Sequence, residues 1–494
     1  MLGFKAVEDY GRAMEVLRAA EYTEAGVGRT LGREQILTMP TTDVPRLIRR
    51  TRELSPLDTF VRLFFLGLPV PEQAVRTALA PMLLDTWVQA ELLCPPALEG
   101  HVAPRVQIWP VSGLMLAVDM PWRQPTAPAR DFVVPPGPLT LELADAMIRR
   151  PCARMLDLGT GSGMLALSAA PHVETVVATD KNERALVFTQ FNAQLNQISH
   201  IHCVAGDLFE PVQQQRFGQV VCNPPFVISP SQRYLFRDSG ERGDVFCRRL
   251  IHAAVEHLET GGFFQLTANA AQQVGRAWKA DLEAWFDNLG CDVLVLVQRT
   301  EDASEYAMNW ILSTETKEAA LVAQRYEAWM AYFEREQIEA VSYLLITLRR
   351  SGGGPTWIQI DDPPCRVVGR CGDELLKFFE CRDAFGDARQ AEDLLQRRLR
   401  LVPNVRIEQE LVMTDRGLEL CHVRLKKTGG LQYPLATHES VGRLLAGCDG
   451  SRTLHQLLEE MVDYLGVDWD RTASAVLPVV RSLLERSVLT AGDR

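Results

Sequence analysis

The stretch that decides the fold is Met155-Leu-Asp-Leu-Gly159-Thr-Gly161-Ser-Gly163. It predicts a strand that ends at Leu158 and turns tightly into a helix, while its backbone passes close to a ligand. Glycine permits both the turn and the close approach, because it has no Cβ atom and tolerates positive φ. An acidic residue, Asp180, lies 21 positions beyond Gly159, which is the spacing expected of a nucleotide-binding β-α-β unit.

Outward from this loop, residues 139–348 alternate between short apolar strands and helices. The expected strands are 154–158, 175–179, 201–205, 219–222, 263–267, 293–297 and 341–348. The expected helices are 139–148, 164–170, 184–195, 245–258 and 277–289. This alternation predicts an α/β fold with a parallel sheet covered by helices on both faces. A helical, aromatic-rich insertion at 301–340 either packs on its own domain or forms a lid over a substrate.

The glycine loop fits two common nucleotide motifs poorly. The dinucleotide pattern places its third glycine one position later than Gly163, and no P-loop Lys-Ser/Thr pair follows. The string D-x-G-x-G-x-G instead resembles motif I of the class I S-adenosylmethionine-dependent methyltransferases. That resemblance implies a Rossmann-like domain with a mostly parallel seven-stranded sheet, and S-adenosylmethionine as the cofactor. A structural glycine turn or a dinucleotide site is the alternative.

The resemblance also implies roles for individual residues. The acid before the glycines, Asp157, would lie near the methionine ammonium group, and Asp180 would take the ribose hydroxyls. Asp207, in Ala205-Gly-Asp-Leu-Phe209, would contact the adenine. The implied cofactor-binding residues are Thr140, Asp157, Gly159, Thr160, Gly161, Gly163, Asp180, Asp207 and Leu208.

A second motif, Asn223-Pro-Pro-Phe226, follows the strand 219–222 and so falls at the same edge of the predicted sheet. Methyl transfer is an in-line displacement, which needs chiefly that a nitrogen lone pair be aligned with the methyl group. The Asn223 side-chain carbonyl and the Pro224 backbone carbonyl can accept the two hydrogens of a planar amino group. Proline has no N–H to compete, and its fixed φ holds the carbonyl direction. Phe226 can stack on the flat acceptor.

This tetrapeptide resembles the (D/N)-P-P-(Y/F) motif of amino-methyltransferases acting on adenine N6, guanine N2 or glutamine amides. Phe226 replaces the tyrosine usual in the glutamine and N6-adenine enzymes, as it does in ribosomal RNA guanine-N2 enzymes. Residues 132–140 resemble the segment that begins the catalytic domain, and residues 237–244 resemble a loop of release-factor glutamine methyltransferases. In that loop Arg237 and Arg242 are either substrate contacts or solvated charges.

Three domains are predicted. Residues 1–131 form a helical N-terminal domain with a short strand pair, for substrate recognition, and a proline-rich passage then leads to the catalytic domain, 132–350. Residues 356–494 form a C-terminal domain that ends in a winged-helix-like unit at 431–494. The whole layout resembles uncharacterised, largely actinobacterial methyltransferases, for which no substrate is implied.

Composition narrows the class of protein. The chain has 494 residues, 47% of them apolar, which is ordinary composition for roughly three globular domains. The 52 basic and 63 acidic residues give a net charge of −11, which argues against a general nucleic-acid or membrane-surface binder. Eleven cysteines with no C-x-x-C spacing indicate reduced thiols, a cytoplasmic protein and no metal site. Acidic residues at positions 8 and 9 argue against a signal peptide.

The sequence therefore predicts an N-methyltransferase acting on a planar amino nitrogen, with a macromolecular partner and no membrane. A nucleobase amine, with RNA favoured, ranks first because of Phe226 and because residues 397–427 hold eight basic and four acidic side chains. The alternatives are a side-chain amide of a protein or peptide, and a small molecule. The oligomeric state is left open.

Overall fold

A computed structural model describes residues 2–32, 44–120, 131–362, 364–385, 391–415, 417–433, 435–437 and 439–492. The chain divides into two compact units. The first comprises Met1–Ala144, Arg150–Val295 and Thr300–Gln359, and the second comprises Asp145–Arg149, Leu296–Arg299 and Ile360–Arg494. The predicted N-terminal and catalytic domains thus share one unit. The domain bounds at 131 and 350 stay predictions, and the first ten residues of the proline-rich passage, 121–130, lie outside the described ranges.

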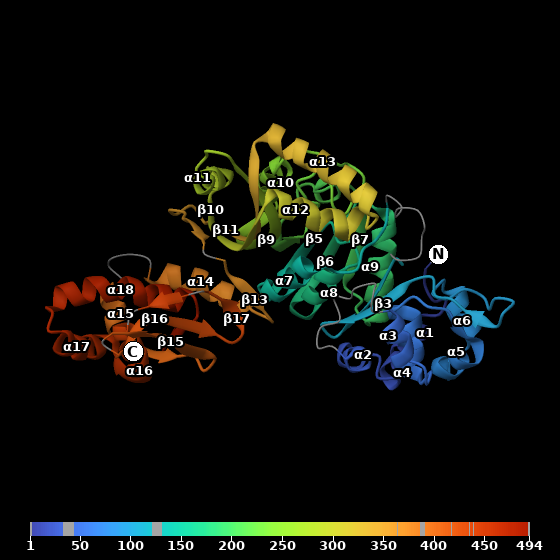
Figure 1. The fold of residues 1–494 in the computed structure, drawn as a ribbon, viewed down its shortest axis with the longest axis horizontal. Helices are drawn as coiled ribbons and strands as arrows, with labels where there is room; N and C mark the ends of the chain where they lie inside the picture. The colour runs from blue at the N-terminus through green and yellow to red at the C-terminus, as the bar shows by residue number, and fades with distance from the viewer. Residues whose placement is uncertain are drawn as a thin grey trace. The chain divides into compact units, whose positions relative to one another are not determined.

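An eight-stranded sheet in the order β12-β10-β11-β9-β8-β5-β6-β7 forms the centre of the catalytic region (Figure 1). Its strands are β5 (Cys152–Leu158), β6 (Val173–Asp180), β7 (Ile201–Ala205), β8 (Phe217–Cys222), β9 (Leu258–Gln273), β10 (Cys291–Asp302), β11 (Ile338–Arg350) and β12 (Ile358–Asp361). β5 through β9 pair in parallel, whereas β11 runs antiparallel to β9. The predicted α/β sheet is confirmed, with one strand more than the seven expected, because β12 forms just after the Gly352–Gly354 linker.

Helices cross between these strands as the alternation predicted. They are α7 (Pro138–Ala146), α8 (Met164–Ala169), α9 (Glu183–Leu195), α10 (Val245–Glu256) and α11 (Trp278–Glu283). The register pairs Leu158 with both Thr179 and Cys222, and Asp180 with Ala205. The carboxyl ends of β5, β6, β7 and β8 therefore meet at one edge, and the loops that follow them converge there.

The insertion consists of α12 (Ala303–Trp310), a π-helical turn (Ile311–Glu315) and α13 (Ala319–Glu336). Its aromatic side chains face the protein: Tyr306, Trp329 and Phe333 are all buried. Both α12 and α13 contact β11. Of the two interpretations of this insertion, the structure supports packing on its own domain.

The N-terminal region is helical and has a short hairpin. Its helices are α1 (Val7–Ala19), α2 (Glu24–Leu31), α3 (Val44–Arg50), α4 (Pro56–Phe60), α5 (Glu72–Leu79) and α6 (Leu84–Gln89). A π-helical turn (Val61–Phe65) follows α4. The short strands are β1 (Val70–Pro71), β2 (His101–Val102), β3 (Gln107–Val111) and β4 (Leu114–Val118), and β3 pairs with β4.

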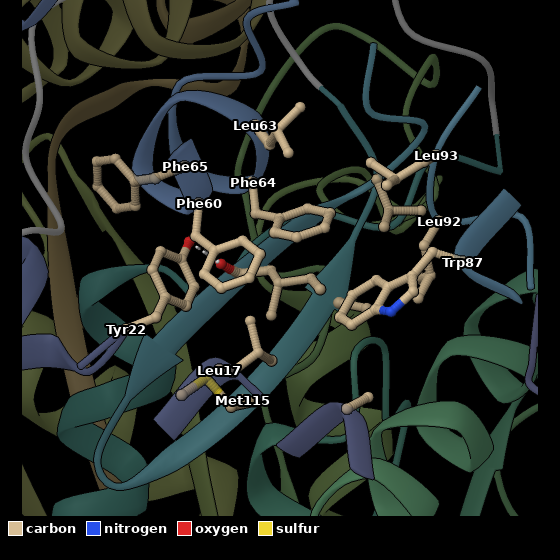
Figure 2. Close-up of a cluster of buried hydrophobic side chains, with 14 of the residues drawn as sticks. Leu17, Tyr22, Phe60, Leu63, Phe64, Phe65, Trp87, Leu92, Leu93 and Met115 are labelled. Carbon is tan, nitrogen blue, oxygen red and sulfur yellow. Dashed lines mark hydrogen bonds between the residues drawn. The ribbon is translucent and has the colours of Figure 1, made fainter. Parts of the chain in front are cut away.

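One apolar core joins this region to the catalytic sheet. Figure 2 shows Phe60, Phe64 and Trp87 side by side, with the ring of Phe64 stacked 5.9 Å from Phe60 and 5.8 Å from Trp87. The same core includes Phe188 and Phe191 of α9, the helix that follows β6. Burial of this shared apolar surface stabilises the contact between the N-terminal region and α9. The N-terminal region therefore packs directly against the catalytic region.

The second unit has its own core, formed largely by the three C-terminal helices. Its helices are α14 (Gly372–Phe385), α15 (Ala391–Leu395), α16 (Glu439–Gly447), α17 (Leu454–Leu465) and α18 (Trp469–Glu485). Its strands are β13 (Arg366–Val368), β14 (Arg398–Leu401), β15 (Val405–Thr414), β16 (Gly417–Lys427), β17 (Gly430–Gln432), β18 (Leu435–Thr437), β19 (Asp449–Thr453) and β20 (Leu489–Ala491). Thr453 caps α17 by accepting a hydrogen bond from the Gln456 N–H. The small sheet β19-β14-β20 uses β14, which lies before the predicted start of the winged-helix-like unit at 431.

Within the described ranges, no helix is both long and apolar enough to cross a membrane.

Candidate active site

A cavity of about 170 Å³ lies where the carboxyl ends of β5 to β8 meet. Two stretches far apart in sequence, 132–136 and 235–236, contribute to its wall together with the strand-end loops. The predicted site residues in its lining are Thr140, Gly159, Thr160, Gly161, Asp180, Asp207, Leu208, Asn223 and Pro224. Asp157, Gly163 and Phe226 are outside the lining.

The glycine loop gives the cavity an exposed backbone wall. Gly159 and Gly161 have φ of 73° and 56°, and a Cβ atom on either would meet nothing within 4 Å. A ligand can therefore approach the backbone there. Gly163 serves packing instead, because a Cβ atom on it would lie 2.8 Å from the Leu167 Cδ1. The first two glycines fit a ligand cradle, and the third fits the close passage of α8.

Asp157 lies fully buried beneath the loop. Its Oδ2 accepts hydrogen bonds from the Thr160 hydroxyl at 2.7 Å and from the Ala166 N–H at 3.0 Å, whereas its Oδ1 has no partner among the described residues. Burial raises the pKa of the Asp157 carboxyl to about 7, although the two hydrogen bonds act in the opposite direction. A buried carboxylate oxygen without a partner fits the cationic group of a ligand.

Asp180 ends β6 and touches the loop directly. Its Oδ2 accepts a hydrogen bond from the Gly161 N–H at 3.0 Å, and its Oδ1 accepts one from the Asn182 N–H at 2.8 Å. Burial raises the pKa of Asp180 despite these bonds. Asp207, after β7, is far more exposed, and its carboxylate lies 4.0 Å from the Lys181 amine. The two acids thus stand at successive strand ends along one wall of the cavity.

Asn223 is held at both ends of its side-chain amide. Its Nδ2 donates to the Thr140 hydroxyl at 2.8 Å, and its Oδ1 accepts from the Thr267 hydroxyl at 2.5 Å. Thr140, predicted as a cofactor contact, therefore also orients Asn223. Thr267 was not predicted, although the pairing of Cys222 with Leu266 places it beside Asn223, directly after the last residue of β9 that pairs with β8. A hydroxyl on the neighbouring strand was the available signal.

The aromatic wall of the cavity differs from the predicted one. Phe226 is buried, with 8% of its surface exposed, and does not line the cavity. Leu235, Phe236 and Phe246 line it instead. The first two belong to residues 227–244, the segment between the Asn-Pro-Pro-Phe motif and α10, which we call the acceptor loop.

Arg237 anchors the acceptor loop and matches neither interpretation given above. Its side chain is fully buried and forms ion pairs with Asp238 at 2.7 Å and Glu315 at 3.0 Å. Its guanidinium also lies 5.7 Å from the centre of the Trp329 ring. The prediction failed because Glu315 and Trp329 come from the insertion, some eighty residues away in sequence. Arg242, the other candidate, is exposed.

Tyrosines of the insertion hold the backbone of the same loop. The Tyr306 hydroxyl accepts a hydrogen bond from the Ile228 N–H at 3.0 Å, and the Tyr332 hydroxyl accepts one from the Gly243 N–H at 3.0 Å. Both ends of the acceptor loop are therefore fixed to the insertion. The insertion supports one wall of the cavity from behind.

Comparisons with known proteins agree with this geometry. Residues 140–292 match the family described as "Methyltransferase small domain", and residues 19–103 and 376–491 match two domains of unknown function, DUF7059 and DUF7782. The chain is 31% identical over 204 residues to the release factor glutamine methyltransferase of Gloeobacter violaceus, covering 36% of this chain and 71% of that protein. It is 33% identical over 163 residues to that of Geobacter sulfurreducens, covering 29% and 57%.

Among solved structures, Trm5b from Pyrococcus abyssi is similar over 51% of this chain and 58% of its own, with 16% identity and a TM-score of 0.31.

Proposed function

Since the chain belongs to the family of methyltransferases that contains the release factor glutamine methyltransferases, we propose that it transfers a methyl group from S-adenosylmethionine to the nitrogen of a side-chain amide in a protein. The observation that carries this proposal is the orientation of Asn223. Its amide stands at the cavity wall beside the glycine loop, with each end fixed by a threonine hydroxyl.

The cofactor side of the cavity supports S-adenosylmethionine as the methyl donor. When bound, this cofactor supplies an electrophilic methyl group on a sulfonium centre. The open backbone at Gly159 and Gly161 admits a ligand. Asp157 is buried beneath the loop, outside the lining, and its unpartnered Oδ1 gives that side of the cavity an anionic group suited to the ammonium end of the cofactor. Asp180 offers carboxylate lone pairs to ribose hydroxyls, and Asp207 stands at the next strand end, where the adenine would lie.

The acceptor side supports a neutral planar amino group. The Asn223 Oδ1 has a second lone pair besides the one that Thr267 occupies, and the Pro224 carbonyl lies next to it in the chain. Together they can accept both hydrogens of an –NH2 group and aim its lone pair along the line of attack. Orientation of this kind supplies much of the rate enhancement of a displacement reaction. Thr140 and Thr267 are positioning residues in this scheme.

Two observations favour an amide over the nucleobase that the sequence ranked first. Phe226, the reason for expecting a stacked base, is buried away from the cavity lining. Four of the eight basic side chains of the stretch 397–427 are already paired with acids: Arg397 with Asp393, Arg424 with Glu410, Lys426 with Glu408 and Lys427 with Glu374. Both relatives described above are named for glutamine methylation of a protein.

The decisive experiment identifies the acceptor. The full chain is incubated with methyl-labelled S-adenosylmethionine and a bacterial lysate freed of small molecules, and the product is then divided between protease and nuclease digestion. We expect protease alone to release the label, and mass spectrometry to find it on the amide nitrogen of glutamine or asparagine. Release by nuclease would overturn the amide proposal in favour of a nucleobase.

A variant of the motif tests the chemistry itself. Asn223→Ala should lower the transfer rate by at least about 100-fold, because the acceptor loses its alignment, while the binding of S-adenosylhomocysteine stays within about twofold of wild type. Transfer assays with the lysate and calorimetric titration measure the two quantities. Undiminished transfer by Asn223→Ala would contradict the assigned role.

A further inference from the structure

The end of β4 carries a buried carboxylate that joins three elements. The Asp119 Oδ2 accepts hydrogen bonds from the Val133 N–H at 2.9 Å and from the Arg184 Nε at 3.0 Å, and its Oδ1 pairs with the other arm of the same guanidinium. The Asp119 N–H also donates to the Val133 carbonyl at 3.1 Å. One residue of the N-terminal region thus fastens both a catalytic-domain segment and the first turn of α9.

The fastened segment is a wall of the cofactor side of the cavity. Residues 132–136, which we call the proline wall, all line the cavity. A second tie comes from Asn182, whose Nδ2 donates to the Asp131 carbonyl at 2.8 Å while its N–H donates to Asp180. Asp119 therefore holds the proline wall at Val133, and Asn182 holds the chain at the preceding Asp131. Asn182 also contacts Asp180, the acid proposed to bind the ribose.

Farther along, β4 and α9 are joined by two side-chain amides. Asn196 bonds the Met115 N–H at 3.0 Å and carbonyl at 2.8 Å, and Asn192 bonds the Ala117 N–H at 2.7 Å and carbonyl at 3.0 Å. Each side-chain amide thus forms the two hydrogen bonds that a neighbouring strand would form with one residue at the edge of β4. Asn192 also donates to the Ser162 carbonyl of the glycine loop at 2.9 Å. Asp119, Asn192 and Asn196 therefore connect β4 with α9 at successive positions. Of these three, Asn196 alone forms no hydrogen bond with a residue of the cavity lining.

We propose that Asp119 is a positioning residue through which the N-terminal region sets the affinity of the cavity for its cofactor; this inference rests on the proposed function. The carboxylate is nearly buried, with 11% of its side chain exposed, whereas Arg184 is 48% exposed. A buried acceptor that satisfies a backbone N–H and a guanidinium at once fixes the spacing between the proline wall and α9. The N-terminal region is then part of the cofactor site as well as an appended module.

The experiment compares Asp119→Asn with a matched control on the same joint, Asn196→Ala. Both variants weaken contacts between β4 and α9, but only Asp119→Asn also weakens the side-chain contact with the proline wall. Calorimetric titration of the full chain with S-adenosylhomocysteine gives the dissociation constant, and thermal unfolding gives the midpoint temperature. We expect Asp119→Asn to weaken binding about tenfold, as loss of a charge-assisted hydrogen bond would. Asn196→Ala should lower the midpoint temperature and leave the dissociation constant unchanged.

Each outcome has one meaning. Equal binding by wild type and Asp119→Asn would overturn the inference and leave the proposed function intact, whereas a wild type that does not bind S-adenosylhomocysteine would sink the proposed function. Equal weakening by both variants would show general loosening of the joint and would also overturn the inference. If Asp119→Asn does not fold, Arg184→Gln replaces it, because the half-exposed arginine can be replaced with less loss of packing than the nearly buried acid. The expected weakening has the same direction.

Discussion

The proposed function assigns one half of the cavity to the cofactor and the other to the acceptor, and the two halves differ in the chemistry of their side chains. The cofactor half has open backbone at Gly159 and Gly161 and two carboxyl groups, Asp157 and Asp180, whose pKa values burial raises. The acceptor half presents neutral groups, the Asn223 amide and two threonine hydroxyls. Acids suit a cationic sulfonium ligand, and neutral hydrogen-bond acceptors suit an amino group that must keep its lone pair free. The charges of the acceptor half lie behind the wall, around Arg237.

The walls of the two halves also differ in how exposed their anchoring ion pairs are. Each is fastened by an arginine that pairs with a carboxylate, Arg184 with Asp119 and Arg237 with Asp238 and Glu315. Arg184 is 48% exposed, whereas Arg237 is fully buried. Water can replace part of what the first pair loses, but it cannot reach the second. Changes at Arg237 should therefore destabilise the whole fold. Changes at Arg184 should alter the proline wall with a smaller loss of stability.

The largest effect is expected at the buried anchor. Arg237→Met fills a similar volume but removes the buried cation that pairs with Asp238 and Glu315, and leaves the half-exposed Arg325, at 3.5 Å, as the cation that still pairs with Glu315. The free energy of unfolding should therefore fall by about 3–5 kcal/mol. Urea denaturation followed by circular dichroism measures it. The matched control is Arg184→Gln, which loses a half-exposed guanidinium that water can partly replace, so its loss should be smaller, about 1–2 kcal/mol. Equal losses in the two variants would show that burial does not distinguish the walls.

The cofactor half should also respond to pH. The folded-state pKa of Asp157 is raised from 3.8 to about 7, so between these values the folded chain holds a proton that the unfolded chain has released. The stabilisation is therefore complete below pH 3.8 and is lost as the pH rises through 7. As the pH rises from 5 to 8, ionisation of Asp157 in the folded protein should therefore decrease the free energy of unfolding by roughly 3 kcal/mol.

Asp157→Asn provides the comparison, because its side chain stays neutral throughout that range. Urea denaturation of both proteins at several pH values should show the variant gaining stability relative to wild type as the pH rises. The matched variant in the acceptor half is Asn223→Ala, whose difference from wild type should stay constant with pH. A constant difference for Asp157→Asn as well would mean that Asp157 ionises normally in the folded protein.

What the sequence predicts well are the features written in adjacent residues. The glycine loop and the Asn-Pro-Pro-Phe motif each follow a strand directly, so the order of strands alone brings Gly159, Asp180 and Asn223 to one edge. The acid at Asp207 follows from the same rule. These residues line one cavity in the structure, because the carboxyl ends of parallel strands converge.

What the sequence did not predict depends on partners far along the chain. From the sequence alone Arg237 resembles a surface charge, but in the structure Glu315 and Trp329 contact it. Thr267 resembles any other strand residue in the sequence, and only the sheet register places it beside Asn223. Phe236 of the acceptor loop was not predicted and lines the cavity, whereas Phe226 lies outside the lining. In each case the partner that decides the residue's environment lies in another element, and no local pattern records it.

The smallest effect is expected at Asn182, which both caps α9 and ties the proline wall. Its Oδ1 accepts a hydrogen bond from the Arg184 N–H at 3.1 Å, and its Nδ2 donates to the Asp131 carbonyl at 2.8 Å. Asn182→Ala removes both contacts and should lower the free energy of unfolding by about 1 kcal/mol. Asn182→Asp keeps a capping oxygen but loses the donor to Asp131, so its stability should return to that of wild type.

The two variants separate capping from fastening of the wall. If the tie to Asp131 acts on the cavity, both should bind S-adenosylhomocysteine about threefold more weakly than wild type, the effect of one neutral hydrogen bond. Calorimetric titration alongside urea denaturation distinguishes the cases. Wild-type affinity in Asn182→Asp would mean that this asparagine only caps the helix, and that Asp119 alone holds the cofactor wall in place.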